Sequence, residues 1–347
     1  MGTAGKNVVG LDIEPGYVAA AEARSAPLEV ERAAVVPLAS GVVRDGEVVD
    51  IDTLAATLHE LFGEQKLGRR VRIGVANQRI VMRTIDLPPL KDPKQITSAV
   101  RFQAQEHIPM PLEQAVLEHQ SLGLVETPEG SRTRVVLVAA RRDMIDRLLE
   151  AVRRAGLRPH GIDLSAFAMI RALHRAGASG TTLYISVGGL TNMAVAVGST
   201  CVFTRAVPQG TELIAAELAE RRGLTREHSH GWLKHVGLVA PIGEIEGDPE
   251  IVLEARTVLT EGVSRIGDDV RNSLDFYKMQ SGGAELERAV TTGPAVAIPG
   301  FVEALEQQLG LTLEVGLVGE SRPGALGGLE AGRLTVAAGL AVEEVAA

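Results

Sequence analysis

The chain has 347 residues, of which 45% are hydrophobic and 23% charged, and its formal net charge at pH 7 is −9. This composition supports a sizeable core, and the length predicts about two domains or one two-lobed unit. The acidic balance and 3% aromatic residues argue against nucleic acid as a partner, because phosphate binding depends on clustered Lys and Arg and single strands stack on aromatic rings. No stretch reaches the ~20 apolar residues of a spanning helix, so we expect no direct membrane insertion.

The first segment predicts a meander of short strands followed by a helix. Apolar runs bounded by turn residues such as Pro15 and Gly16 are typical of strands; they cover residues 8–13, 17–23, 29–36 and 71–76. Leucines at helical spacing predict a helix over 52–62 with Asp52 as its cap. The arginine-rich residues 69–72 are expected at a sheet edge, where positive charge discourages pairing.

Residues 80–158 predict a small α+β module inserted into the first lobe. Its helix, 92–107, carries Pro93 in the first turn, where proline is tolerated. Two prolines at 109 and 111 end that helix. The remaining elements of the module are expected as strands at 80–87, 115–124 and 134–140 and a helix at 142–155.

After a predicted helix at 163–176, the opening pattern returns. Residues 183–189 repeat the strand-and-turn pattern of residues 8–14. Further strands are predicted at 193–197, 201–206, 289–293 and 312–318, and helices at 211–222, 225–235, 250–279, 298–309 and 334–345. Two halves of similar supersecondary structure predict an α/β fold of the actin, heat-shock-chaperone and sugar-kinase type, with two lobes and a cleft between them.

Three motifs carry a family resemblance. Residues 99–111 read AVRFQAQEHIPMP, residues 273–280 read SLDFYKMQ, and VAAR at 138–141 is followed by GLRP at 156–159. In this order the chain resembles the PilM family of actin-like proteins of type IV pilus assembly. It has a weaker likeness to the cell-division protein FtsA and to the cytoplasmic part of the secretion protein GspL.

The resemblance implies four subdomains, with an FtsA-like variant subdomain in place of actin's usual insertion. These are a core subdomain 1A at 1–79, 159–180 and 325–347, an inserted subdomain 1C at 80–158, a core subdomain 2A at 181–211 and 285–324, and a helical subdomain 2B at 212–284. It further implies ATP and Mg²⁺ in the cleft. A groove on the variant subdomain would capture the cytoplasmic N-terminus of the membrane protein PilN, which would hold the chain in the cytoplasm, peripheral to the inner membrane.

The residues expected to bind nucleotide depart from the family pattern. Asp12 matches the carboxylate that holds Mg²⁺ through water, but Glu14 and Pro15 stand where a glycine and an amide donor are needed. Ala19 replaces the lysine, and Ser186 replaces the second carboxylate. Asp12 could equally be a polar residue at a strand end. The candidate nucleotide-binding residues, if the site is retained, are Asp12, Gly188, Gly189 and Gly293.

These departures predict that efficient ATP hydrolysis is absent and leave nucleotide binding open, so that the chain would be a pseudo-ATPase. Without a lysine in the first loop or an acid at position 186, little remains to stabilise a transferring phosphoryl group. In the helix expected near the ribose, Lys234 is kept and Gly231 replaces a glutamate.

The partner surface is expected at the end of the helix 92–107. Its candidate residues are Phe102, Ile108, Pro109, Met110 and Pro111. Prolines hold the chain extended, and a rigid apolar ledge suits a short extended peptide. The alternative is that the apolar members fill the core of the module itself.

The leading hypothesis is a scaffold that recruits a PilN-like tail in type IV pilus assembly. The alternative is an FtsA- or MreB-like ATP-binding filament protein or an active ATPase. An FtsA-like anchor would need a basic amphipathic helix at the C-terminus, whereas residues 342–347 are acidic and apolar. Self-association stays open.

Overall fold

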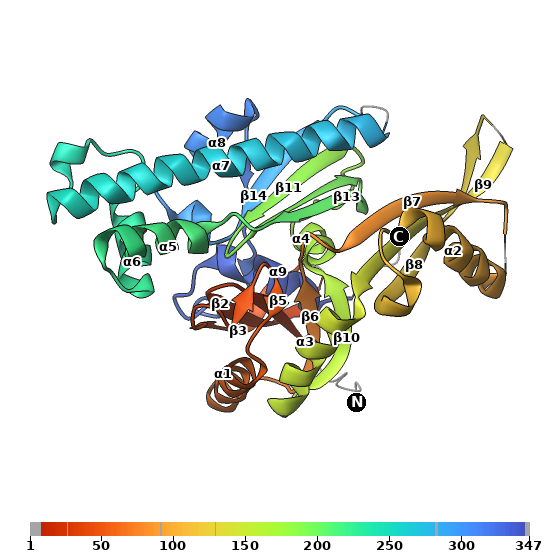
Figure 1. Ribbon diagram of the computed structural model, residues 1–347, viewed down its shortest axis with the longest axis horizontal. Helices are drawn as coiled ribbons and strands as arrows, with labels where there is room; N and C mark the ends of the chain where they lie inside the picture. The colour runs from red at the N-terminus through yellow and green to blue at the C-terminus, as the bar shows by residue number, and fades with distance from the viewer. Residues whose placement is uncertain (1–7, 26, 91, 129, 282–283, 344–347) are drawn as a thin grey trace.

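The computed structural model describes residues 8–25, 27–90, 92–128, 130–281 and 284–343 (Figure 1). The first lobe is built on a six-stranded sheet in the order β10-β6-β1-β2-β3-β16. Its strands are β1 (Val9–Glu14), β2 (Tyr17–Arg24), β3 (Glu29–Pro37), β6 (Arg70–Val75), β10 (Arg158–Leu164) and β16 (Gly319–Glu320). A short hairpin of β4 (Val43–Arg44) and β5 (Glu47–Val48) lies outside this sheet.

The second lobe has a five-stranded sheet in the order β13-β12-β11-β14-β15. Its strands are β11 (Thr181–Val187), β12 (Thr191–Val197), β13 (Thr200–Val207), β14 (Arg288–Thr292) and β15 (Glu314–Val315). In both lobes an antiparallel hairpin is extended by a parallel strand, β6 beside β1 and β14 beside β11. The predicted repeat of supersecondary structure is therefore present in the described residues.

Two helices of mostly small and aliphatic residues lie between the sheets: α4 (Ser165–Leu173) and α9 (Ala331–Ala341) (Figure 1). Glycines allow very close packing here. A Cβ on Gly10 would lie 1.8 Å from the carbonyl oxygen of Ala337, and a Cβ on Gly339 would lie 1.9 Å from that of Ala168. The backbones of strand and helices are thus in direct contact. The predicted helix 334–345 begins earlier, and residues 344–347 lie outside the described part of the chain.

The inserted unit contains α2 (Pro93–His107), the short helix η1 (Leu112–Gln114) and a three-stranded sheet in the order β7-β9-β8. The strands are β7 (Val81–Leu87), β8 (Ala115–Thr127) and β9 (Gly130–Arg141). One face of this sheet and α2 form a separate small core, which contains Ile85, Leu87, Ile96, Val100, Ala104, Ile108, Val135, Leu137 and Ala139. The unit projects away from the lobes (Figure 1).

Helix α3 (Arg142–Arg154), which the sequence placed in the inserted module, packs beside α1 (Ile51–Glu64) instead. Its buried side chains join the core of the first lobe: Met144, Ile145, Leu148, Ala151 and Val152. The four-subdomain division stays a prediction, and the contacts of α3 favour ending the inserted unit near Arg141. The cap of α1 is Asp50, whose carboxylate accepts the Thr53 N–H at 3.0 Å, and not the predicted Asp52.

The helical part of the second lobe covers the outer face of its sheet (Figure 1). It consists of α5 (Thr211–Arg222), α6 (Arg226–Val236), η2 (Ile242–Glu244) and α7 (Pro249–Ser281), and η3 (Pro294–Ala297) and α8 (Phe301–Leu309) follow β14. Although α7 has 33 residues, none of the described helices is both long and apolar enough to cross a membrane.

Two expectations about the first sheet were wrong. Residues 158–164 form β10, whereas the sequence predicted only a helix from 163. Because β10 pairs with β6, the arginine-rich start of β6 is not a sheet edge. Pro159 and Gly161 flank a bulge in β10, and such residues hide a strand from pattern analysis. Of the predicted strand 312–318 only Glu314–Val315 form a strand, β15, which joins the second sheet, and β16 follows this range and joins the first sheet.

Candidate functional site

Two hairpins, one from each lobe, meet between the sheets. In the first, Glu14 pairs with Tyr17 across the tight turn Pro15-Gly16, and Gly16 has the positive φ of +89° that such a turn favours in glycine. In the second, the turn runs from Gly188 to Leu190, and the Gly188 N–H donates to the Leu190 carbonyl at 2.9 Å. The sequence repeat thus supplies both sides of the site.

The hairpins touch through backbone and one carboxylate. Oε2 of Glu14 accepts a hydrogen bond from the Leu190 N–H at 3.1 Å. A Cβ on Gly189 would lie 2.1 Å from the carbonyl oxygen of Pro15, and one on Gly188 would lie 3.0 Å from the Tyr17 hydroxyl. Only glycine permits this approach, so the second turn presents its amides directly to the first hairpin.

Two acidic side chains are buried in this contact. Asp12 is 3% exposed and Glu14 is 6% exposed. Burial raises the pKa of Asp12 to about 7. Burial and the neighbouring Asp12 raise the pKa of Glu14 well above its usual range, against the lowering effect of hydrogen bonds from the Leu190 and Gly189 amides. Two carboxyl groups so close together disfavour double ionisation.

Gly293 completes the group of predicted nucleotide-binding residues. It follows β14 with a φ of +96°, and a Cβ on it would lie 2.5 Å from the carbonyl oxygen of Val187. On its other side, a Cβ on Gly332 of α9 would lie 2.3 Å from the Gly293 carbonyl oxygen. The structure therefore brings the four predicted residues, Asp12, Gly188, Gly189 and Gly293, to one junction, where the chain packs against itself.

Charged side chains cross the rim of this junction, and of these only Lys234 was noted in the sequence, as the lysine kept in the helix expected near the ribose. Lys234 of α6 forms an ion pair with Glu330, which comes just before α9. Arg333 donates to Glu330 at 2.8 Å, and its guanidinium lies 4.8 Å from the centre of the Tyr17 ring. Glu212 of α5 lies against Gly16. No local motif marks Glu330, Arg333 or Glu212, because they come from separate segments.

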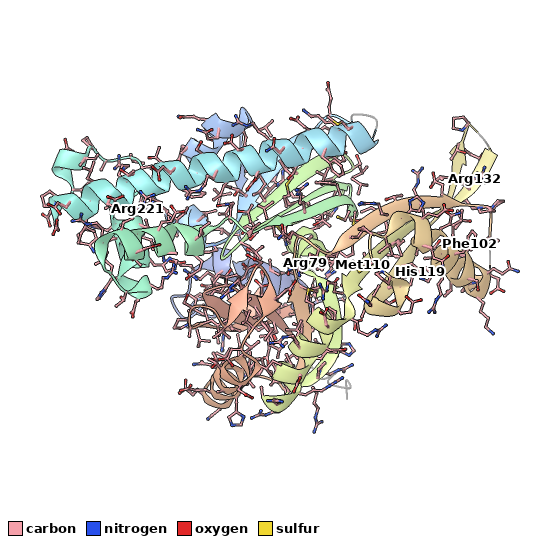
Figure 2. All side chains as sticks on the ribbon, in the orientation of Figure 1. Arg79, Phe102, Met110, His119, Arg132 and Arg221 are labelled. Atoms are coloured by element: carbon pink, nitrogen blue, oxygen red, sulfur yellow. The ribbon has the colours of Figure 1, made fainter. Side chains whose placement is uncertain are left out.

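The predicted partner residues lie at the end of α2 and just after it (Figure 2). The side chain of Phe102 is 67% exposed, whereas Ile108 is buried in the core of the inserted unit. Met110 is half-buried against the same core, and Pro109 and Pro111 are exposed. The segment thus contains both kinds of residue that the sequence left open. Phe102 is exposed and available to a partner, whereas Ile108 belongs to the core of the inserted unit.

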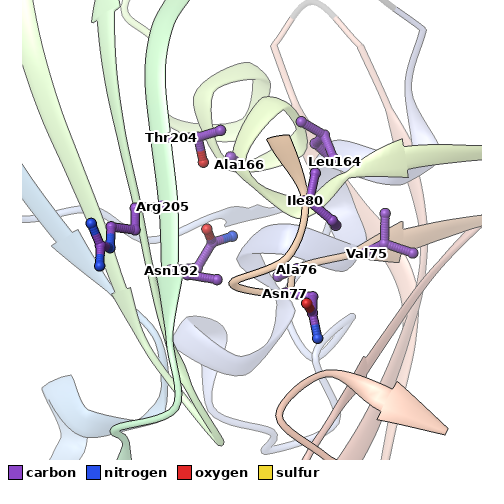
Figure 3. Close-up of a pocket in the computed structure, with 10 residues that line it drawn as sticks. Val75, Ala76, Asn77, Ile80, Leu164, Ala166, Asn192, Thr204 and Arg205 are labelled. Carbon is purple, nitrogen blue, oxygen red and sulfur yellow. The ribbon is translucent and has the colours of Figure 1, made fainter. Parts of the chain in front are cut away.

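A pocket of about 260 Å³, part of it open to solvent, lies where the first lobe, the start of the inserted unit and strands β12 and β13 meet (Figure 3). Its walls combine apolar side chains, such as Val75, Leu164 and Ile80, with polar ones, and exposed Arg205 lies at one side. Within the described part of the chain, Nδ2 of buried Asn192 has no hydrogen-bond partner. No group of three or more potential metal-ligating side chains occurs among the described residues.

The sequence pattern of the family described as type IV pilus assembly protein PilM matches residues 10–344. The chain belongs to the PilM family. This match spans nearly the whole chain and confirms the resemblance predicted from the motifs. Type IV pilus assembly is therefore the process to which the chain is assigned.

Solved structures similar to this PilM-family chain establish the fold. A PilM–PilN type IV pilus biogenesis complex matches with a TM-score of 0.78 and 24% identity, over 96% of this chain and 97% of that one. The ethanolamine utilization protein EutJ from Carboxydothermus hydrogenoformans has a TM-score of 0.53 and 17% identity, over 96% and 88%. MreB5 of Spiroplasma citri bound to ADP has a TM-score of 0.55 and 12% identity, over 96% and 95%. The predicted α/β, two-lobed actin-like fold is confirmed.

Proposed function

We propose that this PilM-family chain is a scaffold of the type IV pilus assembly platform and binds the N-terminal tail of a PilN-like membrane protein at the cytoplasmic face of the inner membrane. The observation that carries the proposal is the likeness to the PilM–PilN complex, which extends over almost all of both chains. The scaffold would reach the membrane through this partner, since none of the described helices could span the bilayer.

The exposed ring of Phe102 on the inserted unit supports a peptide-binding surface there. Because the Phe102 side chain is 67% exposed, its replacement should change the stability of the fold little. The same side chain can bury a large apolar area against a partner. Pro109 and Pro111 restrict the bend that joins α2 to η1 and remove two backbone donors from it. A short apolar peptide segment would find one aromatic anchor and a rigid ledge beside it.

The pocket beside Ile80 is a second candidate surface for the same tail. A pocket with both apolar and polar walls can receive a side chain and form hydrogen bonds with it. The unpaired amide of Asn192 and the guanidinium of Arg205 would suit a carbonyl or carboxylate oxygen of the peptide. This pocket and the surface around Phe102 can be distinguished by mutation.

The experiment is calorimetric titration with a synthetic peptide that has the N-terminal sequence of the PilN-like protein from the same genome. We expect binding by the wild type and at least about tenfold weaker binding by Phe102→Ser, which corresponds to about 1.4 kcal/mol. Leu124→Ser is the matched control, because Leu124 is also exposed (57%) and lies in the same unit. Arg205→Ala reports on the pocket. An absence of binding by the wild type would contradict the scaffold proposal.

As part of the same proposal, we expect that the cleft does not hydrolyse ATP. Pro15 supplies no amide, Ala19 and Ser186 lack the charged groups of the family pattern, and the buried acids Asp12 and Glu14 disfavour phosphate. These residues do not fit ATP with Mg²⁺. A titration with ATP and Mg²⁺ tests this part separately. Heat of binding at micromolar nucleotide, or phosphate release above background, would favour the filament-ATPase alternative.

A further inference from the structure

The starting observation is the hydrogen bond between Glu14 and Leu190. It joins two hairpins whose residues are 176 positions apart, and both groups are buried from water. Amides of a glycine-containing turn commonly bind an external anion, because their N–H groups converge on it. In this protein the oxygen that the amides meet belongs to the chain itself.

The space between the hairpins is also closed. A Cβ on Gly189 would lie 2.1 Å from the Pro15 carbonyl oxygen and 2.9 Å from Pro15 Cδ. Since even a methyl group on Gly189 cannot enter, the two turns are in direct contact, and the Glu14 carboxyl takes the place of an external anion at the Leu190 amide. The turn of the first hairpin is held on its other side, where Gly16 lies against the carboxylate of Glu212 at the start of α5.

From this geometry we propose that the Glu14 carboxyl acts as a built-in hydrogen-bond acceptor, which occupies the amide cradle of the second hairpin and keeps the two lobes closed without nucleotide. The inference rests on the proposed absence of ATP from the cleft, but it does not depend on capture of a PilN-like tail. It gives a structural role to Glu14, which comparison with the family motif shows only as a replacement of the usual glycine.

The ion pair at the rim fits this role. Lys234 comes from α6 of the second lobe, whereas Glu330 precedes α9, which packs against β1 and β2 of the first lobe. The lobes are therefore joined at the floor by Glu14 and at the rim by Glu330. In such an arrangement closure of the lobes does not require the binding of a ligand, because the contacts that close them are part of the fold.

The test compares the wild type with Glu14→Ala, with inorganic pyrophosphate as the probe in calorimetry and thermal melts. Removal of the carboxylate leaves the amides of Gly189 and Leu190 without their acceptor. We expect the variant to bind pyrophosphate at least about tenfold more tightly than the wild type, with a corresponding rise in Tm. Glu113→Ala, an exposed residue of η1, is the matched control and should behave as the wild type.

Hydrogen exchange of the wild type provides a second measurement that does not require a folded variant. The Leu190 amide should exchange as slowly as amides within β11 and β12, since its acceptor is a buried side chain. Exchange as fast as that of an exposed loop amide would overturn the proposal. So would a folded Glu14→Ala protein with no gain in pyrophosphate affinity.

The outcomes also separate this inference from the proposed function. If the wild type binds ATP, both the closed cleft and the absence of ATP fail, while peptide capture is unaffected. If Glu14→Ala gains no affinity for pyrophosphate but the wild type still ignores ATP and binds the peptide, only the role of Glu14 fails. The peptide titration should give the same affinity for the wild type and Glu14→Ala.

Discussion

The hairpins β1–β2 and β11–β12 have the same place in their lobes but opposite chemistry. Each begins the central part of a sheet and is extended by a parallel strand. The second keeps the paired glycines Gly188 and Gly189 and presents backbone donors, whereas the first ends in Glu14 and Pro15 and presents an acceptor. One half of a repeat has thus become complementary to the other.

This difference makes the contact of the two hairpins an internal interface between the lobes. When one hairpin contributes a carboxylate, the amides of the other no longer need an external anion. The acids remain costly, because burial raises the pKa of Asp12 and of Glu14. The predictions below change the acid, the glycine and the rim in turn.

The largest effect is expected from Asp12→Asn. The pKa of Asp12 is about 7 in the folded protein, against 3.8 for the ordinary group. The folded state therefore holds a proton that the unfolded state releases, and wild-type stability falls as pH rises from about 4 to about 7. The amide has no such penalty, so at pH 8 the variant should be more stable by on the order of 2–4 kcal/mol.

Urea denaturation of both proteins at a series of pH values measures this difference. The gap should shrink as the pH falls and vanish near pH 4, where the wild-type carboxyl is protonated in both states. A gap that is constant with pH would mean that Asp12 is not held protonated by its surroundings, which include Glu14 and Tyr17.

A smaller effect is expected from Gly189→Ala, which adds a methyl group to the contact with Pro15. Because the obstacle is backbone, the hairpins must separate, and we expect a loss of about 2 kcal/mol from overpacking. Gly231→Ala is the control. It lies in α6 with nothing within 4 Å of its added Cβ, so it should stabilise by ~0.5–1 kcal/mol.

Equilibrium denaturation measures the change in the free energy of unfolding for each of the two glycine variants. Equal changes in the two variants would show that the hairpins do not pack as closely as the contact of Gly189 with Pro15 indicates. A loss in Gly189→Ala alone would support closure through backbone contact.

The smallest effect is expected at the rim, from Lys234→Met. The ion pair with Glu330 is partly exposed, at 36% and 30% for the two side chains, so solvent screens it. We expect a loss of about 0.5 kcal/mol that diminishes in high salt. Thermal melts at low and high NaCl concentration measure it. A loss as large as that of Gly189→Ala would mean that the rim, and not the floor, holds the lobes together.

The sequence by itself determined the family, the repeat of two lobes and most of the elements, since these depend on local signals. Periodic leucines located α1, and Asp92 with Pro93 located the start of α2. The motif at 99–111 identified the family that the match over 10–344 confirms. Strand β10 was not predicted, because Pro159 and Gly161 interrupt the apolar pattern that is typical of a strand. Only pairing with β6 makes that segment a strand.

The tertiary structure decided which groups the cleft residues meet. The sequence predicted Asp12, Gly188, Gly189 and Gly293 as candidate nucleotide-binding residues, and the structure brings them together. It could not show that Glu14 reaches the Leu190 amide or that Lys234 meets Glu330, because these pairs join distant segments without any shared motif. Whether a buried carboxyl repels a ligand or replaces it depends on which donors surround it, and those donors are set by how the lobes pack.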